Sequence, residues 1–167
     1  MKSFNFHQST EIIFGKGRVS ELGDITKVFG KKVLLVTTPA DVPVLEKQYD
    51  KVKKILKEAG LEVAHFDSVI PNPTVLSITE GAKMAKESGA EVIIGLGGGS
   101  SMDSAKAISV ETTHNGTCWD YLFYKDQPDE EKLLPVIAVS TTSGTGYPGN
   151  SGGSGHKYRS QGQISIV

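Results

Sequence analysis

The segment with the clearest chemical potential is a glycine-rich run that follows a short apolar stretch. Residues 92–96 are rich in β-branched side chains, which is typical of a strand buried on both faces of a parallel sheet. Three glycines come next, Gly97, Gly98 and Gly99. Without β-carbons, the backbone here can adopt positive φ and approach a bound group closely. A helix is expected to follow, with Ser100 or Ser101 as its N-cap, and its unpaired N–H groups would attract a phosphate.

The spacing of this run leaves an alternative open. Gly95-x-Gly97-x-x-Ser100 only approximates the dinucleotide-binding fingerprint, which usually follows the first strand of its domain. Here the run follows a later predicted strand. On these residues alone, a tight turn between strand and helix that binds no ligand remains the alternative.

Apolar periodicity predicts the elements that position this turn. Two short extended pieces within residues 4–14 predict an N-terminal edge hairpin. Helices are expected over residues 18–29, over 42–59 and from Ile78 to Gly89. Strands are expected over residues 32–38, 61–66 and 134–139, of which the first and the last are buried. This alternation predicts an α/β fold with a doubly wound, Rossmann-like parallel sheet. Ligands of such sheets lie beyond the carboxyl ends of the strands, which selects four loops: residues 37–39, 71–74, 97–101 and 140–146.

Longer strings add a family resemblance. Gly97-Gly-Gly-Ser-Ser-Met-Asp-Ser-Ala-Lys106 closely resembles the cofactor loop of the iron-dependent alcohol dehydrogenase family. Three further stretches agree with that family in order: Phe14–Gly17, Pro71–Thr74 and Ser140–Gly146. The resemblance implies that residues 1–146 form a dinucleotide-binding domain of an oxidoreductase that moves hydride between a nicotinamide and an alcohol or aldehyde.

The resemblance also implies which residues contact the cofactor. They are Thr37, Thr38, Asn72, Gly97, Gly98, Gly99, Ser100, Asp103, Thr141, Thr142 and Thr145. The glycines would hold the pyrophosphate, Asp103 would lie towards the nicotinamide ribose, and Asn72 would reach the nicotinamide end. Each has a plainer alternative: Asp103 as an acid favoured near a helix start, the threonines as ordinary turn residues, and Asn72 as part of a good loop.

The choice of nicotinamide depends on the end of the strand over residues 32–38. Members of the family that prefer NAD commonly have an aspartate there, which accepts a hydrogen bond from the ribose 2′-hydroxyl and repels a 2′-phosphate. The matching residue is Thr38, which is neutral, and Thr37 is expected to donate to the phosphate. We therefore expect NADP(H) to be preferred over NAD(H), only modestly because the loop has no arginine. The alternative is that Thr38 merely ends the strand.

The family's metal site and the tail of this chain lead to further expectations. Family members hold iron or zinc through an aspartate and three histidines in a helical second half, which we expect to be absent, so that no catalytic residue is assigned and no turnover is expected. The histidines here lack helical partners at i+3 or i+4: His7, His65, His114 and His156. Residues 147–167 are expected to form an engineered-looking Gly/Ser linker and a final strand; the alternative is a natural truncation or loop variant. The alternative function is an isolated or designed structural α/β module with an unused phosphate-binding loop.

Composition restricts the remaining classes. The 167 residues suit one domain, and a net charge of −1 gives no field for nucleic acid or an anionic membrane. A single cysteine, Cys118, excludes a disulfide framework within the chain, and no apolar run is long enough to span a membrane. We expect a cytoplasmic protein that binds a dinucleotide and offers its N-terminal edge strand for homodimer formation.

Overall fold

The computed structural model describes residues 10–121, 125–142 and 164–166. The strands are β1 (Glu11–Ile13), β2 (Lys32–Val36), β3 (Glu62–Phe66), β4 (Val92–Gly97), β5 (Val136–Ser140) and β6 (Ile164–Ile166). The α-helices are α1 (Leu22–Lys27), α2 (Pro43–Glu58), α3 (Val75–Ser88) and α4 (Gly99–Thr113). Three short 3-10 helices complete the described elements: η1 (Arg18–Glu21), η2 (Cys118–Tyr121) and η3 (Glu130–Lys132).

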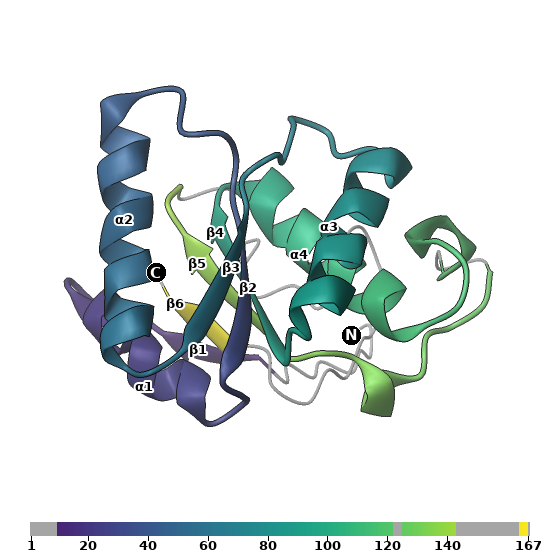
Figure 1. Cartoon of the computed structure of the whole chain (residues 1–167), viewed down its shortest axis with the longest axis horizontal. Helices are drawn as coiled ribbons and strands as arrows, with labels where there is room; N and C mark the ends of the chain where they lie inside the picture. The colour runs from purple at the N-terminus through teal and green to yellow at the C-terminus, as the bar shows by residue number, and fades with distance from the viewer. Residues whose placement is uncertain (1–9, 122–124, 143–163, 167) are drawn as a thin grey trace, which may run out of the picture.

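The six strands form one parallel sheet in the order β1-β6-β5-β4-β2-β3. Helices α1 and α2 cover one face, and α3 and α4 cover the other (Figure 1). Val33 and Leu35 pack into the core beneath α1 and α2, whereas Leu34 and Val36 pack into the core beneath α3 and α4. Because both faces of β2 are buried, the sequence from Val33 to Val36 is continuously apolar rather than alternating. The structure confirms the doubly wound α/β fold.

The direction of strand addition reverses beside β2. From β2 the chain moves outward to β3, then returns to place β4 on the other side of β2. Ligands of open α/β sheets bind at the carboxyl ends of strands where such a reversal occurs. The glycine-rich run therefore stands at the favoured ligand position although it follows the third strand of the α/β succession.

The predicted helices are confirmed, with one difference in type. Helix α3 begins at a capping box in which Thr74 and Ser77 each accept from the other's backbone N–H. It ends at Gly89, whose φ of 63° is the left-handed conformation that suits glycine. The helix expected over residues 18–29 instead starts as the 3-10 helix η1 before α1. Tight bonds from Arg18 N–H to Gly15 O and from Ser20 N–H to Gly17 O explain that start.

The two ends of the described chain meet at one side of the sheet. The edge strand β1 pairs in parallel with β6, which in turn pairs with β5. β6 is the strand expected at the end of the sequence. The first limb of the predicted N-terminal hairpin and the predicted linker over residues 147–163 lie outside the described residues.

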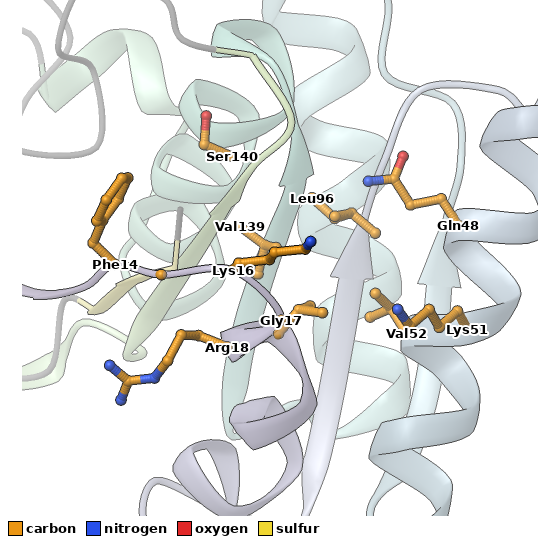
Figure 2. A pocket seen from close by; sticks show the side chains of 12 residues that line it. Phe14, Lys16, Gly17, Arg18, Gln48, Lys51, Val52, Leu96, Val139 and Ser140 are labelled. Carbon is orange, nitrogen blue, oxygen red and sulfur yellow. The ribbon is translucent and has the colours of Figure 1, made fainter.

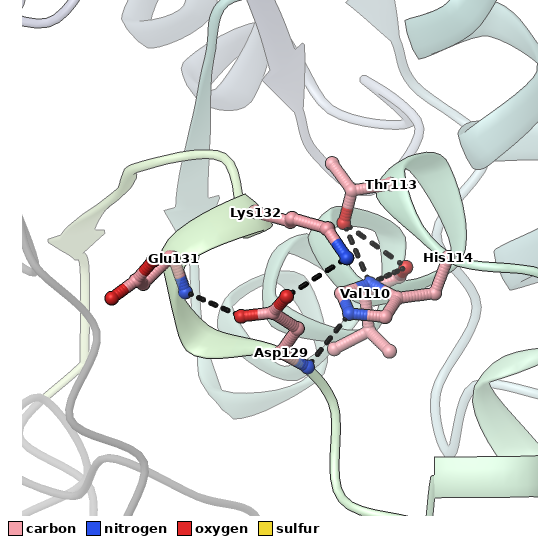
Figure 3. Close-up of polar contacts among 6 residues, drawn as sticks. All are labelled: Val110, Thr113, His114, Asp129, Glu131 and Lys132. Carbon is pink, nitrogen blue, oxygen red and sulfur yellow. Dashed lines mark hydrogen bonds and ion pairs between the residues drawn. The ribbon is translucent and has the colours of Figure 1, made fainter.

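His114 holds the segment that connects α4 to β5 through hydrogen bonds of its ring (Figure 3). Its Nε2 accepts a 2.8 Å hydrogen bond from the backbone N–H of Asp129, and its Nδ1 lies 3.1 Å from the carbonyl of Val110. This pattern assigns the ring proton to Nδ1. The Asp129 carboxylate also lies 2.8 Å from Lys132 Nζ. His114 is thus a structural residue at the end of α4, on the side of the molecule away from the glycine turn.

Candidate functional site

The glycine turn joins β4 to α4 without an intervening loop. Gly98, in extended conformation with φ −87° and ψ −166°, is the N-cap of α4, and the helix starts at Gly99. The predicted N-cap at Ser100 or Ser101 is wrong, because the extended backbone at Gly98 already ends the strand and both serines lie in the first helical turn. No side chain of the described chain caps this helix. The N–H groups of its first turn are therefore directed at the space above the sheet without a capping partner.

The fold requires glycine at only one of the three positions in the turn. Gly97 has a φ of 144°, and a β-carbon there would lie 2.6 Å from Ser101 Oγ. Only Gly97 of the three has positive φ, so the expectation of positive φ applies to it alone. A β-carbon on Gly98 would lie 3.5 Å from Thr142 Oγ1, an ordinary contact, and one on Gly99 would meet nothing within 4 Å. The fold itself does not require glycine at these two positions, which leaves an open cradle of a kind that fits a bound phosphate.

A fourth glycine brings α4 close to the sheet. A β-carbon on Gly95 would lie 2.9 Å from the Ala105 β-carbon and 3.0 Å from the Ser101 carbonyl. The close approach fixes the start of α4 directly above β4. Beneath the turn, the hydroxyl of Ser101 is fully buried and has no hydrogen-bond partner among the described residues.

The loop after β5 forms the neighbouring wall. Thr141 donates its backbone N–H to the carbonyl of Gly97 at 3.0 Å, and Ser140 donates its hydroxyl to the carbonyl of Thr142 at 2.6 Å. Thr141 and Thr142 are exposed. The structure thus brings both threonines beside the glycine turn, as the sequence predicts, whereas Thr145 lies outside the described residues.

The loop after β2 is held by a polar network. The hydroxyl of Thr37 donates to the carbonyl of Thr38 at 2.9 Å and lies 2.9 Å from Nε2 of His65. The Thr38 hydroxyl lies 2.9 Å from the hydroxyl of Tyr49 on α2. Thr37 is fully buried, and its one hydroxyl proton is used within the network. The expectation that Thr37 donates to a cofactor phosphate is therefore wrong in this arrangement, and Thr37 instead positions Thr38.

His65 is a neutral member of this network. Burial is the main cause that lowers the pKa of its imidazole, and the charge of Lys53 lowers it further, against Asp67 and Asp50. Since Thr37 gives its proton to a carbonyl, the His65 ring donates from Nε2. The ring also meets that of Tyr49 edge-on, with centroids 5.9 Å apart. The network packs the Thr38 side chain against α2.

Asp103 lies beyond the first turn of α4 and is half-buried. Burial raises the pKa of its carboxyl, and Lys106 opposes that shift. Burial likewise lowers the pKa of Lys106, opposed by Asp103. The helix macrodipole falls off within the first turn, so the position does not favour the alternative in which Asp103 only stabilises the helix start.

The loop between β3 and α3 lies at the same carboxyl edge of the sheet (Figure 1), and Asn72 belongs to this loop. Its side chain is exposed, and its φ of 54° is a left-handed conformation that asparagine tolerates better than most residues. The described residues among those predicted from the four loops thus lie along one edge of the sheet.

Over residues 10–121, 125–142 and 164–166, no group of three or more His, Cys, Asp or Glu could hold a metal ion. No described helix is long and apolar enough to cross a membrane.

The fold and the turn define an α/β protein with a nucleotide-binding type of fold and an uncapped helix start at the sheet's reversal point. Comparison with known proteins gives the family: residues 9–153 match the iron-containing alcohol dehydrogenases, and the chain belongs to that family. Two proteins of Bacillus subtilis are similar to it. A probable NADH-dependent butanol dehydrogenase is 36% identical over 152 residues, which are 91% of this chain and 38% of that protein. A choline dehydrogenase is 40% identical over 151 residues, 87% of this chain and 36% of that protein.

Solved structures agree with this assignment. The NADH-dependent butanol dehydrogenase A of Thermotoga maritima superposes with a TM-score of 0.86 at 32% identity, covering 99% of this chain and 44% of that one. A halo-thermophilic archaeal alcohol dehydrogenase from a Red Sea brine pool gives a TM-score of 0.85 at 32% identity, covering 100% and 47%. The chain thus spans less than half the length of the relatives and structures that it matches.

Sequence reasoning missed two parts of the site. It did not foresee that Tyr49 and His65 hold the end of β2, although Tyr49 lies on the inward face of a clearly predicted helix. The Phe14–Gly17 stretch was assigned to the family without a role, and the structure places it beside a cavity between α2 and the sheet. In both cases the partners are far apart in the chain, and only the fold brings them together.

Proposed function

We propose that this chain binds a nicotinamide dinucleotide across the carboxyl edge of its sheet, as the cofactor-binding part of an alcohol dehydrogenase. The single observation that carries the proposal is the uncapped start of α4, set at the reversal between β2 and β4. When bound, such a cofactor supplies or accepts hydride from an alcohol or aldehyde. The described residues hold no metal-binding group, so no metal-dependent step is assigned to them.

The proposed roles follow the geometry of the loops. The backbone N–H groups of Gly98, Gly99 and Ser100 bind the pyrophosphate, because they have no capping partner. Thr141 and Thr142 form the facing wall. Asp103 accepts a hydrogen bond from the nicotinamide ribose, and Asn72 lies at the nicotinamide end.

The proposed cofactor is NADP(H) in preference to NAD(H). Thr38 is neutral, and the network to Tyr49 holds its hydroxyl towards α2. No charge at this position repels a ribose 2′-phosphate. The B. subtilis and T. maritima butanol dehydrogenases are named NADH-dependent, so this preference would separate the chain from them.

Calorimetric titration of the whole chain with NADPH, NADH and inorganic phosphate tests the proposal. We expect both dinucleotides to bind, NADPH more tightly, and phosphate only weakly. A folded chain that binds neither dinucleotide at millimolar concentration would refute the cofactor role and favour a structural module. Because a ligand site draws affinity from enclosure, we expect weak binding and no alcohol oxidation from this chain alone, with or without added iron or zinc.

Substitution of Thr38 tests the choice of nicotinamide. Thr38→Asp keeps an acceptor for the Tyr49 hydroxyl but places a negative charge near the 2′-phosphate. The like charges should cost about 1–4 kcal/mol, or roughly ten- to a thousandfold in NADPH affinity, with little change for NADH. Thr38→Ser retains the hydroxyl and is the matched control. Equal losses for both dinucleotides would show that Thr38 is not the selector.

We further propose that the chain forms a homodimer through its edge strand β1. Ile12 on β1 and Phe14 just after it are 51% and 75% exposed, which is unusual for large apolar side chains at a strand edge that pairs with no described strand. Sedimentation velocity on the wild type and on Ile12→Lys would test this. A monomeric wild type at micromolar concentration would contradict it.

A further inference from the structure

A cavity of about 380 Å³ lies on the α1 and α2 face of the sheet, below the carboxyl ends of β4 and β5 (Figure 2). Leu96, Val139 and Val52 form its apolar wall. The segment Phe14–Val19 bounds one side, and α2 bounds the other. Its size is within the range of small-molecule sites, which run from about 300 to 1,000 Å³.

Two lysines enter this cavity from opposite sides. Figure 2 shows Lys16 extending from the loop after β1 and Lys51 extending from α2 into the same space. The third cation, Arg18, is directed away and is held by Glu21, with N–O distances of 2.5 and 2.8 Å. No aspartate or glutamate of the described chain lines the cavity, and neither lysine forms an ion pair with a described residue. Two unneutralised ammonium groups over an apolar wall favour a phosphate dianion attached to an apolar body.

The cavity adjoins the proposed cofactor path. Leu96 directly precedes the glycine turn, and Ser140 directly precedes the threonine wall. On α2, Gln48 lines the cavity next to Tyr49, which holds the Thr38 hydroxyl. The cavity therefore begins where the pyrophosphate turn and the proposed position of the adenosine ribose meet, on the opposite face of the sheet from α4.

We propose that this cavity receives the adenosine end of NADP(H), and that Lys16 and Lys51 bind its ribose 2′-phosphate and determine the preference for the phosphorylated cofactor. The inference rests on the proposed function. Two lysines from separate segments would supply the positive charge that an arginine in the loop after β2 would otherwise provide. Thr38 then only permits the 2′-phosphate, whereas the lysines attract it.

The test compares 2′,5′-ADP, which carries the 2′-phosphate, with ordinary ADP, which does not. Titrations use the wild type, Lys16→Met and Lys51→Met. Lys54→Met is the matched control, because Lys54 lies on the same helix, pairs with Glu58 and is 74% exposed. Methionine keeps most of the side-chain length and removes only the charge.

Each lysine substitution should weaken 2′,5′-ADP about tenfold or more, as expected for a lost charge-assisted hydrogen bond, and leave ADP unchanged. The wild-type preference for 2′,5′-ADP should also shrink in high salt, because both lysines are exposed to solvent. Lys51→Glu should reverse the preference while the far-UV circular dichroism spectrum stays unchanged.

Three results would overturn the proposal. The first is a loss of 2′,5′-ADP binding no larger than in Lys54→Met. The second is an equal loss for ADP, which would assign the lysines to the shared part of the nucleotide. The third is lysine-dependent binding of inorganic phosphate as tight as that of 2′,5′-ADP, which would make this an anion site independent of the cofactor. If the wild type binds neither nucleotide nor NADPH, the proposed function itself fails, and this proposal fails with it.

Discussion

Replacement of Gly98 by alanine tests whether glycine at this position is needed for ligand binding or for the stability of the fold. The backbone there, with φ −87° and ψ −166°, is accessible to any L-residue, and the added carbon would lie 3.5 Å from Thr142 Oγ1. Alanine is a poorer N-cap than glycine by about 1 kcal/mol, but it restricts the unfolded chain and recovers about 0.4–1 kcal/mol. The two effects nearly cancel, so Gly98→Ala should fold with wild-type stability to within about 1 kcal/mol.

Binding should respond very differently. The new methyl group occupies the cradle between the turn and Thr142, and pushes a pyrophosphate away from the N–H groups of α4. Loss of one charge-assisted hydrogen bond is worth about 1.5–3 kcal/mol, which corresponds to roughly ten- to a hundredfold in affinity. Gly98→Val should remove binding altogether. Calorimetric titration with NADPH measures the affinity, and urea unfolding followed by circular dichroism measures the stability.

Gly97→Ala is the contrasting variant. Its φ of 144° disfavours any β-carbon, and that carbon would lie 2.6 Å from Ser101 Oγ. We expect a loss of stability on the order of 1–3 kcal/mol from backbone strain, with further loss from the close contact. Unchanged NADPH affinity in a stably folded Gly98→Ala would refute the assignment of the turn as the pyrophosphate site.

Three further predictions concern side chains of α4. Ser101→Ala removes a buried hydroxyl without a described partner and should stabilise the fold by about 1 kcal/mol. Ser109→Ala on the same helix removes a 2.8 Å hydrogen bond to the Leu134 carbonyl and should destabilise the fold by about the same amount. Urea unfolding of both variants measures the two changes in stability. Changes of the same sign would contradict this explanation. Asp103→Asn should raise the melting temperature at neutral pH, because burial raises the pKa of the carboxyl and so disfavours its charged form. The sign follows from proton binding: the native state holds the proton more tightly than the unfolded chain, so wild-type stability falls as pH rises above the ordinary aspartate pKa. The gain in stability of Asp103→Asn over the wild type should therefore vanish in acid. At neutral pH the same variant should bind NADPH more weakly than the wild type does. An Asp103→Asn variant less stable than the wild type at neutral pH would contradict the reasoning.

Much of the fold could be predicted because its signals are local. The β-branched run of residues 92–96 and the regular apolar spacing on α2 are each contained within one element, and burial on both faces of a parallel sheet requires such patterns. The prediction of Ser100 or Ser101 as the N-cap of α4 was wrong, also for a local reason. A serine suits an N-cap in general, but the extended backbone at Gly98 makes that glycine the cap, and only coordinates show it.

The sequence alone determined the α/β class, the glycine turn and the family, because strand and helix periodicity and a string of adjacent residues are readable in chain order. The tertiary structure decided which groups remain available to a ligand. Parallel pairing of β2 with β3 places His65 beside Thr37, and the packing of α2 on the sheet places Tyr49 beside Thr38. Thr37 is buried in this network and donates its hydroxyl proton to the Thr38 carbonyl, so the proton is not available to a ligand. The same packing brings Lys16 and Lys51 to one cavity. Contacts between distant segments depend on how the sheet orders its strands, and that order is a property of the whole fold rather than of any stretch of sequence.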